Sequence, residues 1–220
     1  MILGTKSSNT LLHDITNSLP HHVVSETPPQ AKWKRLQRIQ EVLTDTRIDQ
    51  AGSKRPIYLV IDQCESPNEA KLDYVKDRIQ FDKKLFVPRV SNGGGLVLYW
   101  KISVEIDIVS SSVNHIDVIV NKNSGDPWRF TGFYGEPETH KRQESWDLLR
   151  SLYGQSSLLW LCVGDFNEIV KQSEKLGGRL KSYAQMQIFR DALDECELMD
   201  LGFKGFPYTW CKHYRNGVSI

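Results

Sequence analysis

The chain has 220 residues, of which 40% are hydrophobic and 25% charged, and its net charge at pH 7 is +1. These values are typical of one soluble globular domain, and no apolar run approaches the roughly 18 residues that a membrane span requires. A net charge so close to zero excludes a protein whose overall field attracts nucleic acid or an anionic membrane, so such contacts must be local.

The amino-terminal residues lack the charged region and the long apolar region of a secretory signal, which favours an intracellular location, the nucleus included. Cysteines in a reducing compartment are expected to be free thiols. Cys196, Cys211 and His213 include no closely spaced cysteine pair, so a zinc site is not predicted. The other two cysteines are Cys64 and Cys162.

Residues 1–53 are expected to form a tail that is largely disordered. Its first part is rich in Ser, Thr, Asn, His and Pro and shows no sustained hydrophobic period. Over 31–47, apolar residues recur at helical spacing, which predicts an amphipathic helix. The Gly- and Pro-containing break at 50–56 places the start of the folded domain near residue 54.

From Ile57 onward the sequence predicts short strands separated by turns. Strands are expected over 57–61, 85–90, 96–102, 104–109, 115–120, 128–134 and 205–211. The strands over 104–109 and 115–120 alternate apolar and polar residues, which predicts a sheet with one face in water. A helix over 68–79 is expected to bury Leu72, Val75 and Ile79.

Two further helices are predicted to cover the sheets. Thr139 can cap the first, which runs to about Tyr153, and Ser182 with Gln185 has the spacing of a capping box at the start of the second. The order of elements predicts an α+β sandwich with two sheets face to face and helices outside. The buried helical stripes are expected at Trp146, Leu149, Leu152 and Tyr153, and at Met186, Phe189, Leu193 and Cys196.

The stretch Leu158–Glu168, which reads Leu-Leu-Trp-Leu-Cys-Val-Gly-Asp-Phe-Asn-Glu, indicates a site at the end of a strand. Its apolar half predicts a strand buried on both faces, and Gly164 would let the backbone turn. If the strand continues, Asp165 and Asn167 point to one side with Phe166 opposite. A carboxylate and an amide there can hold a hard cation and a phosphate oxygen. The alternative is an Asx turn that closes the strand.

Two basic clusters could provide local contacts with nucleic acid. One covers residues 32–38, and the other consists of Lys171, Lys175, Arg179 and Lys181, directly after the acidic strand end. The alternative for both clusters is a solvated face, because runs of charge usually serve solubility. The second cluster is favoured as a binding surface by its place beside the candidate phosphate site.

Several of these segments together resemble the endonuclease/exonuclease/phosphatase superfamily, which has the DNase I-like fold. They are Gly-Asp-Phe-Asn-Glu-Ile at 164–169, Thr-Gly-Phe-Tyr-Gly-Glu-Pro at 131–137 and Gly-Phe-Pro-Tyr-Thr-Trp at 205–210. Residues 94–101 and 141–149 are similar to the endonuclease domain of plant LINE-type non-LTR retrotransposon polyproteins. The resemblance extends over about 57–220 and implies a DNase I-like two-sheet β-sandwich flanked by helices.

The resemblance also implies an activity and its site. Asp165 matches the catalytic aspartate, Asn167 the asparagine that binds the scissile phosphate, and Tyr134 a tyrosine of the same pocket. The implied reaction is Mg²⁺-dependent hydrolysis of a phosphodiester in DNA. Lys175, Arg179 and Lys181 of the second basic cluster are the candidate nucleic-acid contacts, because of their position beside this site. Without the resemblance, Tyr134 could equally be a core aromatic residue with a wet hydroxyl.

Some family segments are altered or not found. Asp62 takes the place of the metal-binding glutamate, with Glu65 three residues on, and both are candidate Mg²⁺ ligands. A Trp-Asn strand is not found before Ile57, and a closing Ser-Asp-His segment would come after Ile220. We therefore expect 54–220 to be a partial domain, truncated at both ends, with impaired catalysis.

Two rival interpretations keep a similar fold without the nuclease. One is a non-catalytic nucleic-acid-binding remnant or a decayed open reading frame, and the other is a phosphatase that acts on lipid or nucleotide phosphates. Under each nucleic-acid interpretation, DNA is the expected partner. No membrane association and no obligate protein partner are expected.

Overall fold

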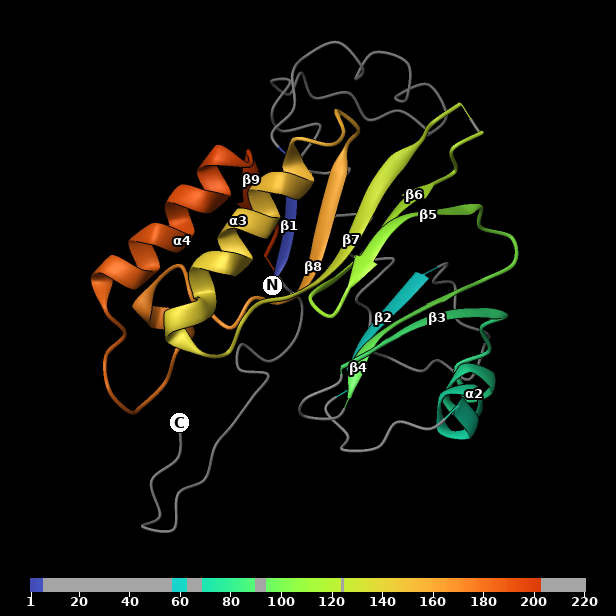
Figure 1. Ribbon diagram of the computed structural model, residues 1–220, viewed down its shortest axis with the longest axis horizontal. Coiled ribbons are helices and arrows are strands. Elements are labelled where there is room, and N and C mark those ends of the chain that lie inside the picture. Colours follow the sequence, from blue (N-terminus) through green and yellow to red (C-terminus); the bar gives the residue numbers. More distant parts are fainter. Residues whose placement is uncertain (6–56, 63–68, 90–93, 124, 203–220) are drawn as a thin grey trace, which may run out of the picture.

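The computed structural model describes residues 1–5, 57–62, 69–89, 94–123 and 125–202. The helix expected over 31–47, the basic cluster at 32–38 and the strand expected over 205–211 lie outside these residues. The other predicted elements are all present, with ends that differ from the expectation by a few residues. They form two sheets and the helices that cover them (Figure 1).

The large sheet holds six strands in the order β5-β6-β7-β8-β1-β9. Only β7 and β8 of this sheet run parallel among the described strands, and the crossover between them contains a short 3₁₀ helix, η2 (Thr139–Lys141), and α3 (Arg142–Tyr153). The strands are β5 (Ile106–Ser112), β6 (His115–Val120), β7 (Trp128–Tyr134), β8 (Trp160–Asp165), β1 (Ile2–Thr5) and β9 (Leu198–Asp200).

The small sheet has three antiparallel strands in the order β2-β4-β3. Its central strand, β4 (Gly95–Trp100), lies between β2 (Ile57–Asp62) and β3 (Lys83–Pro88). The helix α2 (Glu69–Arg78) covers its outer face, with Leu72 buried as the spacing predicts. The Tyr99 hydroxyl donates a hydrogen bond of 3.2 Å to the Leu72 carbonyl, which ties this helix to the sheet.

The two sheets pack face to face around a shared hydrophobic core. Leu96 and Leu98 of β4 contribute from one sheet, and Ile116, Phe130 and Leu161 contribute from the other. Strand β2 lies across β8, and β4 lies across β6 and β7. The sheets approach closely at Gly132, where an added Cβ atom would overlap the Leu59 side chain.

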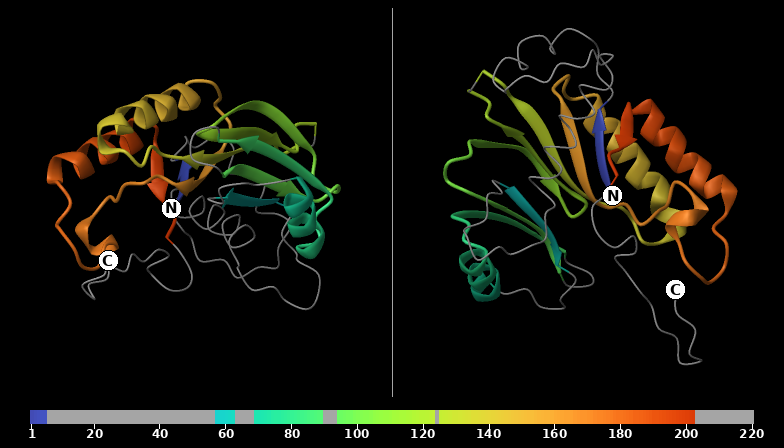
Figure 2. Two further views of the ribbon diagram at one scale, coloured as in Figure 1. Left: turned by 60° about the horizontal axis from the view of Figure 1, so that its bottom comes forward. Right: turned by 180° about the vertical axis from the view of Figure 1, so that it is seen from behind.

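The outer face of the large sheet is covered by α3 and α4 (Tyr183–Glu195), and the apolar and aromatic side chains of these two helices form a second hydrophobic core against it. Trp146 of α3 stacks on Phe189 of α4 with ring centroids 4.5 Å apart. Figure 2 shows these two helices on one side and α2 on the other, with the sheets between them. The predicted α+β architecture of two facing sheets flanked by helices is confirmed. No helix in the described part of the chain is long and apolar enough to cross a bilayer.

The prediction of a wet outer face on β6 is wrong. Asp117 on that face has no exposed surface, and Arg129 of the next strand is 1% exposed. The two side chains pair inside the fold, and Arg129 Nη1 also donates to the Leu152 carbonyl at the end of α3. The alternation of β6 therefore marks a buried polar pair beneath a helix, and not a face that is exposed to solvent.

Residues 2–5, which were expected in the tail, form strand β1 between β8 and β9. Leu3 is completely buried in the second core, and the backbone of Met1 pairs with Gly164 in both directions. A strand of four residues is too short to show a hydrophobic period, and β9, which was also not predicted, has only three.

The predicted start of α4 is correct in position but not in mechanism, and the prediction that Thr139 caps α3 is wrong. Thr139 begins η2, and Lys141 is the N-cap of α3. Ser182 is the N-cap of α4 as expected, but its side chain makes no capping hydrogen bond to the described residues. The buried stripes of both helices lie where their spacing places them, apart from the half-buried Tyr153.

Two cysteines, Cys162 and Cys196, are free and buried, as expected for a chain without disulfides. Burial raises the pKa of the Cys162 thiol and raises that of Cys196 to about 11. Neutral, buried thiols are poor nucleophiles, so these two cysteines serve packing. Cys64 and Cys211 lie outside the described residues.

Candidate active site

The candidate site lies where β7 and β8 end. Tyr134 and Asp165 are register partners across these two parallel strands, so both reach the same edge of the sheet. Because side chains alternate along a strand, Asp165 lies on the same face as Leu161 and Val163, which is the face toward the small sheet. Tyr134 is buried in the core on that face, whereas Asp165 is exposed. The pairing brings together two of the predicted site residues.

Asn167, the third predicted catalytic residue, lies in a turn formed with Asp165. Its backbone N–H donates to Asp165 Oδ1 at 2.9 Å, and its own φ is +54°. Its Nδ2 donates to the Gly135 carbonyl at 2.7 Å, so the amide lies across the end of β7. The Asx turn and the predicted presentation of both side chains at one strand end therefore occur together.

Phe166 lies on the opposite side of this turn, as the alternation predicts. It is 2% exposed and stacks on Phe133 of β7 with ring centroids 5.0 Å apart. It also contacts the ring of Phe189 on α4, at a centroid distance of 5.7 Å. The aromatic anchor fixes the turn against the second core and leaves the polar residues on either side of it at the surface.

Two glycines allow the ends of β7 and β8 to approach closely. A Cβ atom on Gly164 would overlap the Phe133 carbonyl oxygen, and one on Gly135 would overlap the Phe166 carbonyl. The Gly135 N–H also donates to the Asp165 carbonyl at 2.8 Å. Gly164 was expected to turn the chain out of the core. In the structure it is a strand residue, and its small size is needed for contact with the neighbouring strand.

The small sheet brings its own strand ends to the same edge. Asp62, Gly95 and Pro88 are register partners across β2, β4 and β3, and Arg89 follows Pro88 directly. The Arg89 guanidinium lies over the Tyr134 ring, 4.3 Å from its centroid. The backbone of Asp62 therefore lies at the edge of the small sheet from which Arg89 reaches the site, whereas Glu65 falls outside the described residues.

Three polar residues of this edge were not predicted from the sequence: Arg89, Asn114 and Glu136. Arg89 and Glu136 form an ion pair of 3.9 Å, and each side chain is 18% exposed. Asn114 donates from Nδ2 to Glu136 Oε1 at 3.0 Å and to the Tyr134 carbonyl at 2.9 Å. Their only sequence signal is a position at strand ends, which does not reveal that two different sheets meet there.

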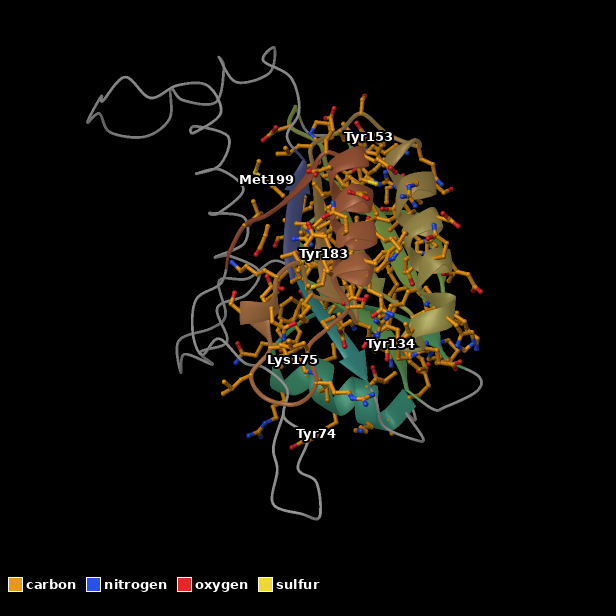
Figure 3. The ribbon with its side chains drawn as sticks, turned by 90° about the vertical axis from the view of Figure 1, so that its left-hand side faces the viewer. Tyr74, Tyr134, Tyr153, Lys175, Tyr183 and Met199 are labelled. Atoms are coloured by element: carbon orange, nitrogen blue, oxygen red, sulfur yellow. The ribbon has the colours of Figure 1, made fainter. Side chains whose placement is uncertain are left out.

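The loop that follows the site is held by a buried carboxylate. The Glu168 side chain is 1% exposed and accepts from Arg142 at 2.7 Å and from Lys181 at 3.0 Å. Lys181, predicted to contact nucleic acid, is thus committed to this internal ion pair. Lys175 donates to the Arg179 carbonyl at 2.6 Å, and Arg179 is exposed. In Figure 3, Lys175 and Tyr134 lie toward the same end of the ribbon, away from Tyr153 and Met199.

The acidic side chains described at this edge do not form a metal centre by themselves. Within the described ranges, no three His, Cys, Asp or Glu residues gather in a way that could hold a cation. Asp165 offers an exposed carboxylate, but Glu136 is engaged by Arg89 and Asn114. The described donor set therefore does not fit Mg²⁺, which prefers several oxygen ligands in a strict octahedral arrangement.

Comparison with known proteins finds similarity in part of the fold. The human Nocturnin catalytic domain with bound sulfate anion has 11% sequence identity and a TM-score of 0.39, with 62% of this chain and 57% of that chain covered. The endonuclease domain of TRAS1, a telomere-specific non-LTR retrotransposon, has 13% identity and a TM-score of 0.44, with 65% and 59% covered.

A third similar structure is ANGEL2, a 2',3'-cyclic phosphatase, in complex with adenosine-2',3'-vanadate. Its identity is 10% and its TM-score 0.40, with 64% of this chain and 44% of that chain covered. No family model and no curated protein matches the sequence. The chain spans about half of the length of the solved structures that it resembles.

Proposed function

We propose that the chain is a DNase I-like phosphodiester hydrolase domain that acts on DNA and derives from a LINE-type retrotransposon endonuclease. The observation that carries this proposal is the pairing of Tyr134 with Asp165 at the ends of two parallel strands, with Asn167 in the adjoining turn. The sequence motifs around these residues resemble the family's catalytic motifs, and the fold brings them to one edge.

Each of the three residues has a role that suits its position. The exposed Asp165 carboxylate would orient the attacking water or take its proton. The Asn167 amide and the Tyr134 hydroxyl would hold oxygens of the scissile phosphate. The turn hydrogen bond to Asp165 Oδ1 leaves Oδ2 of the same carboxylate for the water.

Mg²⁺ is the cofactor implied by the family resemblance, and its chemistry would be to neutralise charge that develops on the phosphate. Asp62 and Glu65 are its proposed ligands. Because Asp62 stands where the family has the longer glutamate, and a Mg²⁺ site tolerates little misplacement of its ligands, we propose that cleavage is slower than in family members that keep the glutamate. Asp165, Asn167 and Tyr134 would still bind and orient the phosphodiester and the attacking water.

Nicking of supercoiled plasmid tests the proposal. The unmodified protein is expected to nick slowly with Mg²⁺ and to stop when EDTA is added, and Asp165→Ala should abolish the activity. Asp77→Ala is the matched control, because Asp77 lies on α2 with a side chain that is 75% exposed. Equal nicking by Asp165→Ala and the unmodified protein would refute the assigned site, and turnover equal to that of DNase I would refute the slow-catalysis part.

A non-catalytic nucleic-acid-binding remnant is the second candidate, favoured by the exposed Arg179 in the loop after the site. It predicts DNA binding that survives Asp165→Ala, falls steeply with salt, and weakens when Lys175 and Arg179 are neutralised. Binding of this kind, combined with no nicking under any metal condition, would replace the hydrolase proposal with this one.

A further inference from the structure

Arg89 is a cation at the candidate site whose guanidinium finds no hydrogen-bond acceptor in the described part of the chain. Its guanidinium lies on the Tyr134 ring, and the side chain is only 18% exposed. The ion pair with Glu136, at 3.9 Å, is longer than a hydrogen bond. The guanidinium donates no hydrogen bond to any of the described residues. A guanidinium has five N–H donors, so this one is held in place while its donors remain available.

The surroundings of Arg89 suit an anion with several oxygens. A planar guanidinium binds phosphate through two parallel hydrogen bonds, a geometry that the ammonium of lysine cannot match. The Tyr134 ring holds the guanidinium at this edge through a cation–π contact. Asn114 donates at 3.0 Å to Glu136 Oε1, the same oxygen that Arg89 approaches, so the carboxylate that faces Arg89 is also held in place.

We infer that Arg89 binds a backbone phosphate of the DNA, and that the Glu136 carboxylate is the counter-charge of Arg89 when no DNA is bound. The inference rests on the proposed function and adds a binding residue from the small sheet to a site otherwise built on the large one. Glu136 then competes with the phosphate for the guanidinium. Loss of Arg89 must weaken DNA binding, and loss of the Glu136 charge must strengthen it.

Binding can be measured by fluorescence anisotropy with a short labelled DNA duplex, in EDTA so that cleavage cannot interfere. The logarithm of the binding constant falls linearly with the logarithm of salt concentration, with a slope of about 0.9 per phosphate neutralised on duplex DNA. Arg89→Ala should weaken binding and reduce the slope by about 1. Arg89→Lys should keep the slope and bind with an intermediate affinity, because lysine retains the charge but cannot donate two parallel hydrogen bonds to one phosphate.

Lys122→Ala is the matched control for the loss of one cation. Lys122 lies before the first residue of β7, whereas Tyr134 is the last residue of that strand, and the Lys122 side chain is 53% exposed. This variant should leave both the affinity and the salt slope unchanged. An equal loss in Lys122→Ala and Arg89→Ala would show a general charge effect and would refute the assignment of Arg89.

A double-mutant cycle separates release of Arg89 from the general effect of removing a negative charge. Glu136→Gln keeps an acceptor oxygen for Asn114 and should bind DNA more tightly than the unmodified protein. In the Arg89→Ala background the same substitution should bring no gain. A gain that persists without Arg89 would overturn the competition between Glu136 and phosphate.

The outcomes distinguish this inference from the proposed function. No DNA binding by the unmodified protein would overturn both. Binding and Asp165-dependent nicking with an unchanged salt slope in Arg89→Ala would overturn the Arg89 assignment alone. Circular dichroism checks that each variant is folded, and if Arg89→Ala does not fold, the Arg89→Lys and Glu136→Gln variants decide the question.

Discussion

Asp117 and Arg129 face each other on neighbouring strands inside the large sheet and form a two-point ion pair, with distances of 2.8 and 2.9 Å. Thr131 donates to the same carboxylate at 2.5 Å, and the Trp160 indole donates to the Thr131 hydroxyl at 2.7 Å. Each guanidinium nitrogen and each carboxylate oxygen of the pair thus has a hydrogen-bond partner within the fold, which is the condition under which buried charges are tolerated.

Asp117→Asn should lower the free energy of unfolding by about 3–5 kcal/mol, because it leaves a buried guanidinium without a counter-charge. Urea denaturation followed by tryptophan fluorescence measures the change. The control is Asp107→Asn, which breaks an exposed pair with Lys122 and should cost at most about 1 kcal/mol. Similar costs for both variants would contradict the structural role assigned to the buried pair.

Gly164→Ala should destabilise the protein severely, because the added methyl group would overlap the Phe133 carbonyl of the adjoining strand. Backbone of a paired strand cannot move aside without breaking the ladder, so a loss of folded protein at 25 °C is expected. Gly125→Ala, where the added Cβ meets no atom within 4 Å, is the control and should unfold at an unchanged temperature. Thermal unfolding curves of the two variants provide the comparison.

Glu168→Gln should loosen the loop between β8 and α4, because Arg142 and Lys181 both lose their shared counter-charge. We expect a loss of about 1–3 kcal/mol in unfolding free energy, the usual range for hydrogen bonds to charged groups. Amide hydrogen exchange should quicken over 169–181 before it changes elsewhere. Glu195→Gln, which breaks an exposed pair with Arg150, serves as control; faster exchange in that variant over the same residues would count against the prediction.

His115 should make stability depend on pH. Burial lowers the pKa of this imidazole below its ordinary value, an effect reinforced by the Arg129 charge and opposed by Asp117. The unfolded chain then binds the proton more readily, so the unfolding free energy should fall as pH drops below about 6.5 until the folded pKa is reached. Urea titrations at intervals of about half a pH unit, from neutral to acid pH, should show a shallower fall of the unfolding free energy in His115→Gln. An identical fall in this variant would exclude His115 as the source of the pH dependence.

Much of the fold follows from hydrophobic spacing alone. The stripe of α4 and the strands β6 and β7 lie where their periods place them, because each buries one continuous apolar set. What spacing misses is which other element covers a face. Asp117 looks like a solvated residue in the sequence, and it is buried because Arg129 and the end of α3 meet it there.

The candidate site could be predicted in part. Asp165 and Asn167 lie in one short segment at a predicted strand end, whereas Tyr134 is assigned through the family resemblance. Arg89 belongs to the other sheet, and only the packing of two sheets brings it to Tyr134. Lys181 shows the opposite case, since a residue that looks like part of a basic surface is committed to the buried Glu168.

Strand β1 constrains the order in which the molecule can assemble. Leu3 pairs with Cys162 on one side and with Asp200 on the other, so both of its neighbours are synthesised long after it. During synthesis, residues 2–5 have neither neighbouring strand to pair with until β8 and β9 are made, whereas the small sheet and the β5-β6-β7 meander can already form. Closing such long loops carries an entropic cost and slows folding. We therefore expect the last native contacts to appear only after residue 200 has emerged, with the unpaired edge of β8 a transient site for chaperone binding or aggregation.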